Sequence, residues 1–471
     1  MSDLSLDFIL KATGGKLLSE KAKSFRGVGT DSRADLSGQI FVALAGENFD
    51  GHGFLAAAVE KGASALLVHD ESKVGALGDR ATVIRVPDTL KALQAMGRAV
   101  RLQSKALVIG LTGSNGKTTT KEFIAATLAP FKKVHASKGS FNNHWGVPFT
   151  LLQLEPEKEV AVIEMGMNHA GEITELVSIA EPDVVLCTMV GRAHVEHFGS
   201  IEKIAAAKEE IYETAKPEAI RIYNLDNPWT KKMFEKASQR FPRSRLLTFS
   251  SVEAGADVLL RIARLGMREM VIEGQIAGEV GRVEVQVFGA QNLVNLMAAA
   301  AAGLAAGLKP AQIWQGLAEC RTAWGRNQFV RLKSGAEMIF DAYNANPDSM
   351  AALLDNMKLL ESKGKKIGVF GQMLELGETS PQLHEELARH AGVAGFDQLF
   401  FIGADEKSFR QGLEGVGYKG ELHTGRDYSD SLGKTLAGSL KPDDIVVVKG
   451  SRGTKLERFV EPCEPLDFGK K

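Results

Sequence analysis

Residues 112–120 read TGSNGKTTT, directly after the apolar run 106–111 (ALVIGL) and before a helix-like stretch, KEFIAATLA. A strand, a tight glycine turn and a helix in this order can hold phosphate with backbone N–H groups and the helix N-terminus. Gly113 and Gly116 lack the Cβ atoms that would block the approach of the ligand. The longer consensus G-x-x-x-x-G-K-[ST] is not fully met, because Leu111 stands at its first glycine. The stretch predicts an ATP site; the alternative is a glycine turn with a surface lysine.

Three residues in and after this loop predict the chemistry of the site. Lys117 can reach the β- and γ-phosphates as a point charge, and Thr118 can offer its hydroxyl to Mg²⁺. Glu164 ends the strand-like run VAVIE, where a carboxylate can hold Mg²⁺ beside a nucleotide, although helix capping is an alternative. The loop residues that we expect to bind ATP are Gly113, Ser114, Asn115, Gly116, Lys117, Thr118 and Thr119.

Composition limits the class of protein. At 471 residues the chain suggests about three domains of roughly 150 residues each. A formal net charge of −1 gives no electrostatic case for nucleic acid or for an anionic membrane. The three cysteines are far apart, which argues against a disulfide framework and against a cysteine zinc site. With no signal-like N-terminus and no apolar run long enough to insert into a membrane, we expect a cytoplasmic protein.

The order of strand-like and helix-like runs predicts an α/β fold in three domains. Residues 1–103 predict a small α/β domain. Residues 104–326 open with the phosphate loop and predict a central P-loop-type domain with a mostly parallel sheet. Residues 327–471 alternate strands and helices again, which predicts a Rossmann-like domain with a crevice at the carboxyl ends of its strands.

Several further residues indicate a functional site only when they are considered together. His194 and Lys208 follow the strand-like run DVVLCTMV, but a loop histidine and a helix lysine are more often solvated. Asn292 and Asn295 lie three apart on one helix face, where they could reach an adenine edge, and helix capping is an equal alternative. Asp341 ends a strand before the turn NANP, and turn chemistry alone explains most of that motif.

Taken in chain order, these segments resemble the Mur ligase family over essentially the whole length. The pairing of YNANP with MLELG is typical of the branch that adds D-alanyl-D-alanine, whereas the phosphate loop is also shared with folylpolyglutamate synthases. The motifs are TDSRADLSGQIFVALAGENFDGHGF, TGSNGKTTT, KGSFNNHWGVPFTLL, IEMGM, AHVEHFGSIEKIAAAKEEI, WGRNQF, DAYNANPDSM, GQMLELGETSPQLH and VKGSRGTKLE.

The resemblance implies an ATP-dependent amide-bond ligase of peptidoglycan precursor synthesis. Such an enzyme adds D-alanyl-D-alanine to UDP-N-acetylmuramoyl-tripeptide through an acyl phosphate, and we expect it to act as a monomer. The three domains would take the UDP-sugar, ATP and the incoming dipeptide, in that order. The residues assigned to substrate binding are Ser32, Arg33, Asn48, Asp50, His52, Asn142, Asn143, Asn344, Asn346, Ser451 and Arg452.

By the same resemblance the enzyme uses two Mg²⁺ ions. Thr118 and Glu164 would hold one ion, and Glu164, His194 and a carbamylated Lys208 would hold the other. The remaining ATP contacts would be Asn292 and Asn295 to adenine, Arg326 to the γ-phosphate and Asp341 to the ribose. The residues given a catalytic role are Lys117, His194, Lys208 and Arg326.

Two departures from the family pattern concern the nucleotide contacts. Gln291 stands where the family often has histidine, and Trp324 replaces a residue that is commonly proline. Two other activities stay open: addition of a single amino acid, and a P-loop ATPase or kinase that needs neither substrate. The third residue of the stem peptide, meso-diaminopimelate or lysine, is also open, because pocket shape decides it.

Overall fold

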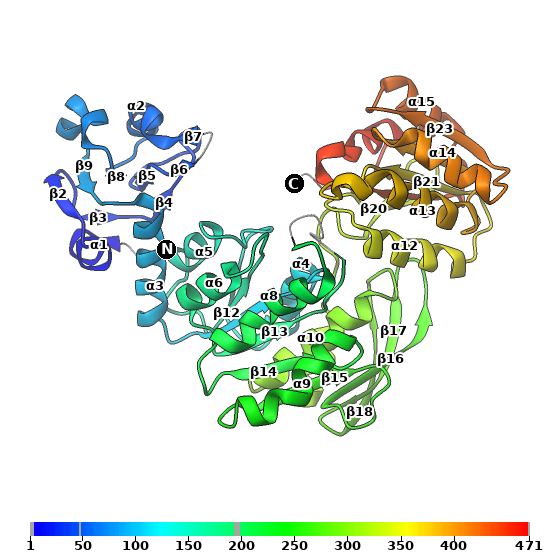
Figure 1. The fold of residues 1–471 in the computed structure, drawn as a ribbon, viewed down its shortest axis with the longest axis horizontal. Coiled ribbons are helices and arrows are strands. Elements are labelled where there is room, and N and C mark those ends of the chain that lie inside the picture. Colours follow the sequence, from blue (N-terminus) through cyan, green and yellow to red (C-terminus); the bar gives the residue numbers. More distant parts are fainter. Residues whose placement is uncertain (1–3, 47–48, 193–197, 470–471) are drawn as a thin grey trace.

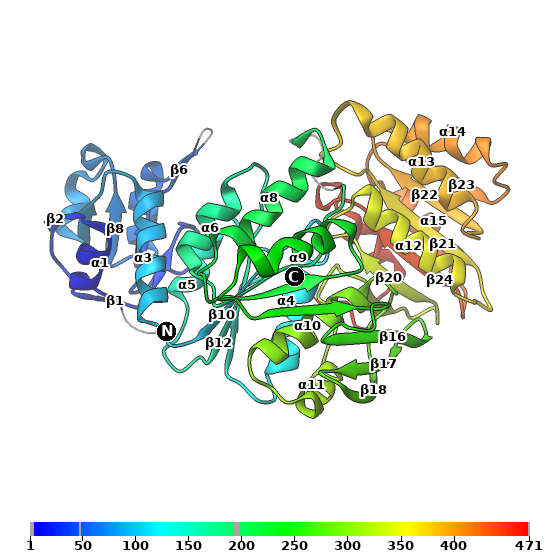
Figure 2. The same cartoon turned by 60° about the horizontal axis from the view of Figure 1, so that its bottom comes forward.

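The computed structural model describes residues 4–46, 49–192 and 198–469. Three α/β units follow one another along the chain, each built on its own sheet. The N-terminal unit (blue) and the C-terminal unit (yellow to red) lie on opposite sides of the central unit in both Figure 1 and Figure 2. This order confirms the predicted α/β class and the three-domain architecture.

The N-terminal unit has a five-stranded sheet in the order β2-β9-β8-β5-β4, in which only β2 is antiparallel to its neighbour. The runs SALLVH and ATVIRV form buried parallel strands, as their apolar composition predicts. Its elements are β1 (Leu4–Ser5), α1 (Leu6–Thr13), β2 (Lys16–Ser19), β3 (Ser24–Phe25), β4 (Val28–Gly29), β5 (Ile40–Val42), β6 (Ala45–Gly46), β7 (Phe49–Asp50), η1 (Gly51–Phe54), α2 (Leu55–Glu60), β8 (Ala65–Val68), η2 (Glu71–Lys73), η3 (Gly75–Asp79), β9 (Thr82–Arg85) and α3 (Thr89–Gln103).

The central unit has a nine-stranded sheet in the order β11-β12-β10-β13-β14-β15-β16-β17-β18. Pairing is parallel from β11 to β16 and antiparallel from β16 to β18. Strand β10 lies between β12 and β13, which is the point where strand order reverses and where ligands of such sheets bind. Its elements are β10 (Leu107–Thr112), α4 (Lys117–Leu128), β11 (Val134–Ala136), α5 (Gly146–Leu152), β12 (Val160–Glu164), α6 (Glu172–Ala180), β13 (Val184–Cys187), α8 (Ile201–Thr214), β14 (Ile220–Asn224), α9 (Pro228–Arg240), β15 (Leu246–Ser250), β16 (Val258–Leu265), β17 (Met270–Ile276), β18 (Glu279–Val285), α10 (Asn292–Ala305) and α11 (Pro310–Leu317).

Both faces of the central sheet are buried, which explains its continuous apolar strands. Ile109 and Leu111 of β10 pack in the core with α4 and α10, whereas Val108 packs on the other face with α5, α6 and α8. The alanine-rich run after Asn292 lies almost wholly within the first of these cores. The carboxyl end of β10 is thereby held rigidly between two layers of helices.

The C-terminal unit has a six-stranded sheet in the order β19-β20-β24-β21-β22-β23, parallel except for β19. Ile339 packs on one face, and its neighbours Met338 and Phe340 pack on the other. Its elements are β19 (Gln328–Arg331), β20 (Glu337–Asp341), α12 (Pro347–Leu359), β21 (Lys366–Gly371), η4 (Gly377–Thr379), α13 (Ser380–Gly392), β22 (Gln398–Ile402), α14 (Glu406–Gly415), β23 (Glu421–Gly425), α15 (Asp430–Ser439), β24 (Ile445–Lys449), η5 (Arg452–Thr454), η6 (Leu456–Phe459) and η7 (Glu461–Cys463).

The described ranges contain no helix that is both long and apolar enough to cross a bilayer. Helix α3 connects the first two units and packs closely against α5 of the central unit. We propose that the N-terminal unit ends near residue 103 and that the central unit ends near residue 326.

Candidate active site

The phosphate loop joins β10 to α4 and needs glycine at two positions. Gly113 and Gly116 have φ values of +152° and +80°, which residues with a side chain rarely adopt. A Cβ on Gly113 would lie 1.9 Å from Thr188 Oγ1, and one on Gly116 would lie 2.3 Å from Asn295 Oδ1. Helix α4 begins directly at Lys117, so its free N–H groups face the loop. The predicted strand, glycine turn and helix are present in this order.

Lys117 lies at the base of this loop. Its Nζ donates to the carbonyl oxygen of Gly113 at 2.8 Å. Burial lowers the pKa of Lys117, and the nearby Glu164 carboxylate opposes that shift. The ammonium group therefore lies where the negative charge of a phosphate would compensate its loss of hydration.

Oxygen donors suited to Mg²⁺ gather beside Lys117. Glu164 is buried at the end of β12, and its Oε1 accepts from Asn142 Nδ2 at 2.8 Å. Its Oε2 is buried and has no hydrogen-bond partner in the described part of the chain. Thr118 and Asn142 line the same cavity as Glu164. A buried, unpartnered carboxylate oxygen beside a hydroxyl fits a hard divalent cation.

Lys208 lies on α8 and is 1% exposed. Burial is the main cause that lowers the pKa of Lys208 to about 7, and the charge of Lys117 adds to the effect. Carbamylation requires a neutral amine, and a lowered pKa favours that form. Lys208 is not among the residues that line the cavity. His194, the third proposed ligand of that ion, lies outside the described residues. Among the residues that the structure describes, no group of three or more His, Cys, Asp or Glu side chains is placed to hold a metal ion.

The two asparagines of α10 are buried and hydrogen-bonded to protein groups. Asn295 Oδ1 accepts from Thr120 Oγ1 at 3.0 Å, and Asn295 Nδ2 donates to Asn292 Oδ1 at 2.8 Å. Asn292 Nδ2 donates to the carbonyl oxygen of Phe288 at 2.7 Å. Both line the cavity. Asn295 lies against Gly116 of the phosphate loop, and Asn292 holds the Asn295 amide in place.

The C-terminal unit supplies the facing wall of the cavity. Arg326 Nη2 donates to Thr118 Oγ1 at 2.9 Å, and the guanidinium lies 4.4 Å from the centre of the Tyr343 ring. Asn346 Nδ2 donates to Asn115 Oδ1 of the phosphate loop at 2.7 Å. The cavity has a volume of about 500 Å³ and is shared by residues of both units.

Asp341 ends β20 and is held on both oxygens. Its Oδ2 accepts from Lys449 Nζ at 2.6 Å, and its Oδ1 accepts from the backbone N–H of Asn327 at 3.0 Å. Lys449 ends the neighbouring strand β24, so parallel pairing places the two charges together. Lys449 and the carbonyl oxygen of Asn344 are 3.3 Å apart, which fixes the turn after β20.

Other predicted residues lie apart from this cavity. Ser32 and Arg33 form an exposed turn of the N-terminal unit, where Arg33 is paired with Asp31. Asn48 falls outside the described residues. Asp50 accepts from the backbone N–H and from the ring Nδ1 of His52.

The buried ring of His52 has hydrogen-bond partners within the protein at both of its nitrogens. Its Nε2 accepts from the backbone N–H groups of His69 and Asp70, which places the ring proton on Nδ1. His52 therefore shapes the loop and presents no unpaired ring nitrogen to a ligand.

Three further predicted residues have structural partners. Asn143 accepts from the N–H of Gly146 at the start of α5. Ser451 accepts from the N–H of Leu374, and Arg452 pairs with Glu457. Asn143, Ser451 and Arg452 are absent from the cavity lining.

Sequence reasoning missed several residues of the cavity. Lys449 ends the apolar run IVVVK, and a charge at the carboxyl end of a buried strand is a signal that could have identified it. Ser140, 3.3 Å from Thr118 Oγ1, and Asp348 carry no comparable local signal.

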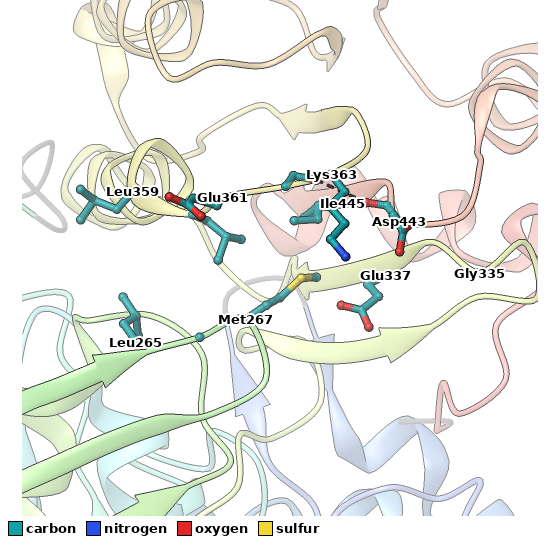
Figure 3. Close-up of a pocket in the computed structure, with 12 residues that line it drawn as sticks. Leu265, Met267, Gly335, Glu337, Leu359, Glu361, Lys363, Asp443 and Ile445 are labelled. Carbon is teal, nitrogen blue, oxygen red and sulfur yellow. Dashed lines mark hydrogen bonds between the residues drawn. The ribbon is translucent and has the colours of Figure 1, made fainter.

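A second cavity of about 510 Å³ lies between the β16–β17 loop and the C-terminal unit. Figure 3 shows Met267 facing the same hollow as Lys363 and Glu337. Glu337 and Ile445 begin β20 and β24, so this cavity is at the amino edge of the sheet. Ligands of parallel sheets bind at the opposite, carboxyl edge, which favours the phosphate-loop cavity as the active site.

Comparison with known proteins agrees with this architecture. Three domain descriptions match the chain: Mur ligase family, catalytic domain (residues 24–101), Mur ligase middle domain (residues 111–303) and Mur ligase, glutamate ligase domain (residues 325–452). The UDP-N-acetylmuramoyl-tripeptide–D-alanyl-D-alanine ligase of Bacillus subtilis is 34% identical, with 92% of each chain covered.

Solved structures are also similar. A crystal structure of MurF from Acinetobacter baumannii matches with a TM-score of 0.87 at 30% identity, covering 98% of each chain. MurF from Thermotoga maritima in complex with ADP matches with a TM-score of 0.77 at 29% identity, covering 93% of this chain and 96% of that one. Sequence motifs, site geometry and both comparisons agree, and the chain belongs to the Mur ligase family.

Proposed function

We propose that this chain is an ATP-dependent ligase that joins D-alanyl-D-alanine to UDP-N-acetylmuramoyl-tripeptide in peptidoglycan precursor synthesis. The observation that carries the proposal is the single cavity in which the phosphate loop, Glu164 and Arg326 meet. The name of the Bacillus subtilis relative supports the choice of substrates. The ADP in the similar Thermotoga maritima structure supports the choice of nucleotide.

The reaction needs an activated carboxylate. A carboxylate oxygen of the tripeptide attacks the γ-phosphorus of ATP, the bond from that phosphorus to the β–γ bridging oxygen breaks, and ADP leaves. The neutral amine of D-alanyl-D-alanine then attacks the acyl phosphate, phosphate leaves, and the amine loses a proton. Neither step uses a serine or cysteine nucleophile.

Lys117 and Arg326 are placed to neutralise the charge of the transferring phosphoryl group. Lys117 lies at the start of α4, and Arg326 reaches the same helix through Thr118. Fixed positive groups at this position stabilise the charge that spreads over the phosphoryl oxygens. Because Arg326 lies in the segment that leads into the C-terminal unit, correct docking of that unit is part of catalysis.

Thr118 and Glu164 would hold one Mg²⁺, and Glu164, His194 and carbamylated Lys208 a second. Mg²⁺, when bound, supplies positive charge and a fixed geometry for the phosphate oxygens. The unpartnered Oε2 of Glu164 is the structural support for a cation here.

Carbamylation of Lys208 is part of the proposal. The neutral amine attacks the carbon of CO₂, a C–N bond forms, and one proton is released, which leaves a carbamate with two oxygens. A pKa lowered to about 7 by burial makes a large share of this amine neutral near neutral pH. The carbamate would replace a positive charge with a negative one where a cation needs a ligand.

The outer units would bind the remaining substrates. In the N-terminal unit Ser32, Arg33 and Asp50 remain candidates for the UDP-sugar, with His52 holding the loop. In the C-terminal unit Asn344 and Asn346 line the cavity and are better candidates for the dipeptide than Ser451 or Arg452. We propose that the protein is cytoplasmic and monomeric. Light scattering on the purified protein would test the monomeric state.

The deciding experiment measures phosphate release from ATP against UDP-N-acetylmuramoyl-peptides with and without D-alanyl-D-alanine. We expect release only when tripeptide and dipeptide are both present, together with formation of the pentapeptide product. Turnover without either substrate would favour an ATPase. Turnover with a single amino acid in place of the dipeptide would favour another branch of the family.

A further inference from the structure

Helix α12 of the C-terminal unit touches the central unit through its first turn. Asp348 lies in that turn, and its Oδ2 accepts from the backbone N–H of Arg192 at 2.7 Å. Its Oδ1 and Arg192 Nε are 3.3 Å apart. We propose that Asp348 is a positioning residue that couples the phosphate loop to the C-terminal unit through Gly191 and Arg192; the proposal rests on the proposed ATP site.

The segment that Asp348 contacts is itself bonded to the phosphate loop. Ser114 Oγ donates to the carbonyl oxygen of Gly191 at 3.0 Å, and the N–H of Gly191 and Ser114 Oγ are 2.9 Å apart. Ser114 N also donates to the carbonyl oxygen of Met189. A continuous path of short contacts therefore runs from the loop through residues 191 and 192 to α12.

Gly191 leaves room for the Asp348 carboxylate at the start of α12. A Cβ at this position would lie 2.6 Å from Asp348 Oδ2, closer than a real Cβ contact allows. The carboxylate and the backbone of Gly191 thus fit together without room for a side chain. The contact is specific in shape as well as in charge.

The backbone bond matters more than the ion pair. The Arg192 side chain is 60% exposed, and exposed pairs of this kind stabilise little. The N–H of Arg192, by contrast, donates to a charged acceptor, and such bonds are about twice as strong as neutral ones. Loss of the carboxylate should therefore matter more than loss of the guanidinium.

Asp348 also acts on residues that line the active cavity. Asn346 is the N-cap of α12 and contacts Asn115, so the same helix end touches the loop twice. When α12 moves away, the side chain of Asn346 and the turn that carries Asn344 move with it. Docking and nucleotide affinity are then linked, because the apparent affinity for nucleotide rises in proportion to the fraction of molecules that is docked.

The first test needs no nucleotide and so is independent of the proposed function. Fluorescent labels at K236C on α9 and E414C on α14 report the distance between the two units, and both parent residues are exposed. The three native cysteines are buried. We expect D348A to broaden the distance distribution and shift it to longer values; a distribution equal to that of the parent protein would overturn the proposal.

The second test measures affinity and turnover. We expect D348A to raise the Kd of a non-hydrolysable ATP analogue and the KM of ATP by about tenfold, as when only about a tenth of the molecules is docked. The loss should fall on the Kd and KM of ATP more than on kcat, and binding of the UDP-sugar peptide should not change. D348N keeps one acceptor oxygen and should recover part of the loss.

Three controls separate this role from general effects of charge or fold. D355N changes an exposed carboxylate of the same helix that pairs with His390, and should behave as wild type. E337Q breaks an ion pair with Arg268 that also joins the two units, but far from the loop, and should leave the Kd nearly unchanged. G191A should reproduce D348A without changing any charge.

A thermal melt confirms that each variant is folded. Tighter nucleotide binding in D348A would mean that the carboxylate only repels phosphate, and would overturn the proposal. An equal loss of affinity in E337Q would overturn it as well, because any weakening of the interface would then suffice.

Discussion

Arg326 and Thr118 are 208 residues apart in the chain, yet the arginine Nη2 donates to the threonine Oγ1 at 2.9 Å. Thr118 belongs to α4 behind the phosphate loop, and Arg326 lies in the segment that leads into the C-terminal unit. Both residues line the phosphate-loop cavity, so in the proposed function a phosphate group bound there would be contacted by α4 and by the segment that leads into the C-terminal unit.

Replacing Arg326 by alanine should lower kcat for ligation by about 10²- to 10³-fold, the usual effect of removing one charge-stabilising donor in a transition state. Arg326→Lys should recover part of the activity. Arg331→Ala is the matched control, because Arg331 is paired with Asp467 outside the cavity. Phosphate release and product formation, measured together, check this; normal turnover in Arg326→Ala would exclude the assigned role.

Lys117→Ala should abolish ligation and leave binding of the UDP-sugar peptide largely intact. The lysine is buried against Gly113 in the central unit, whereas the candidate UDP-sugar residues lie in the N-terminal unit. Calorimetry with the UDP-sugar peptide and a phosphate-release assay measure the two properties separately. Lys105→Ala changes an exposed lysine before β10 and should be silent. Near-normal phosphate release by Lys117→Ala would contradict the assignment of the loop as the ATP site.

Lys208→Ala should lose ligation by more than about 100-fold, since it removes a group proposed to stabilise the phosphoryl transition state. Short carboxylic acids such as formate or acetate should restore part of the activity, because their oxygens can replace those of the carbamate. Lys203→Ala, on the exposed side of the same helix, is the control. Wild-type activity in Lys208→Ala would eliminate the carbamate hypothesis.

The pKa of Lys208 also predicts how stability depends on pH. Burial lowers this pKa from its ordinary value of 10.5 to about 7, so between these values the unfolded chain binds more protons than the folded one. Stability from this group therefore rises with pH across that window, and the cost of burial is complete below about pH 7.

Lys208→Met removes that cost. In CO₂-free buffer with EDTA, the variant should unfold at a higher temperature than wild type at pH 6–7. The free energy of unfolding should differ by on the order of a few kcal/mol, and the difference should shrink towards pH 10. A melting-temperature difference that is constant with pH would show that burial does not shift this lysine.

Lys449→Met should destabilise the C-terminal unit by about 3–5 kcal/mol, because it leaves the Asp341 carboxylate buried without its partner. The side chains of Lys449 and Asp341 are only 3% and 13% exposed. The double variant Lys449→Met with Asp341→Asn should regain much of the loss, since no unpaired charge remains. Denaturant unfolding of the wild type, the two single variants and the double variant gives the coupling free energy. A value near zero would rule out a stabilising pair.

The local features of this protein were predictable from short stretches of sequence. The run ALVIGL, the two glycines and the following helix specify the phosphate loop because each depends on neighbouring residues only. Glu164 at the end of β12 was predictable for the same reason, as was the α/β class. The start of α12 at Pro347 also has a local cause, because Asn346 caps the helix and a proline fits its first turn.

The tertiary structure decided which of these residues meet. The order of strands brings Lys449 to Asp341 and the docking of α12 brings Asp348 to Arg192, over separations of more than a hundred residues. It also gave His52 and Asn143 protein partners, where the motif alone suggested substrate. Local propensity determines strands, turns and helices, whereas contacts between distant residues depend on how the sheets pair and the units pack, which no short stretch of sequence encodes.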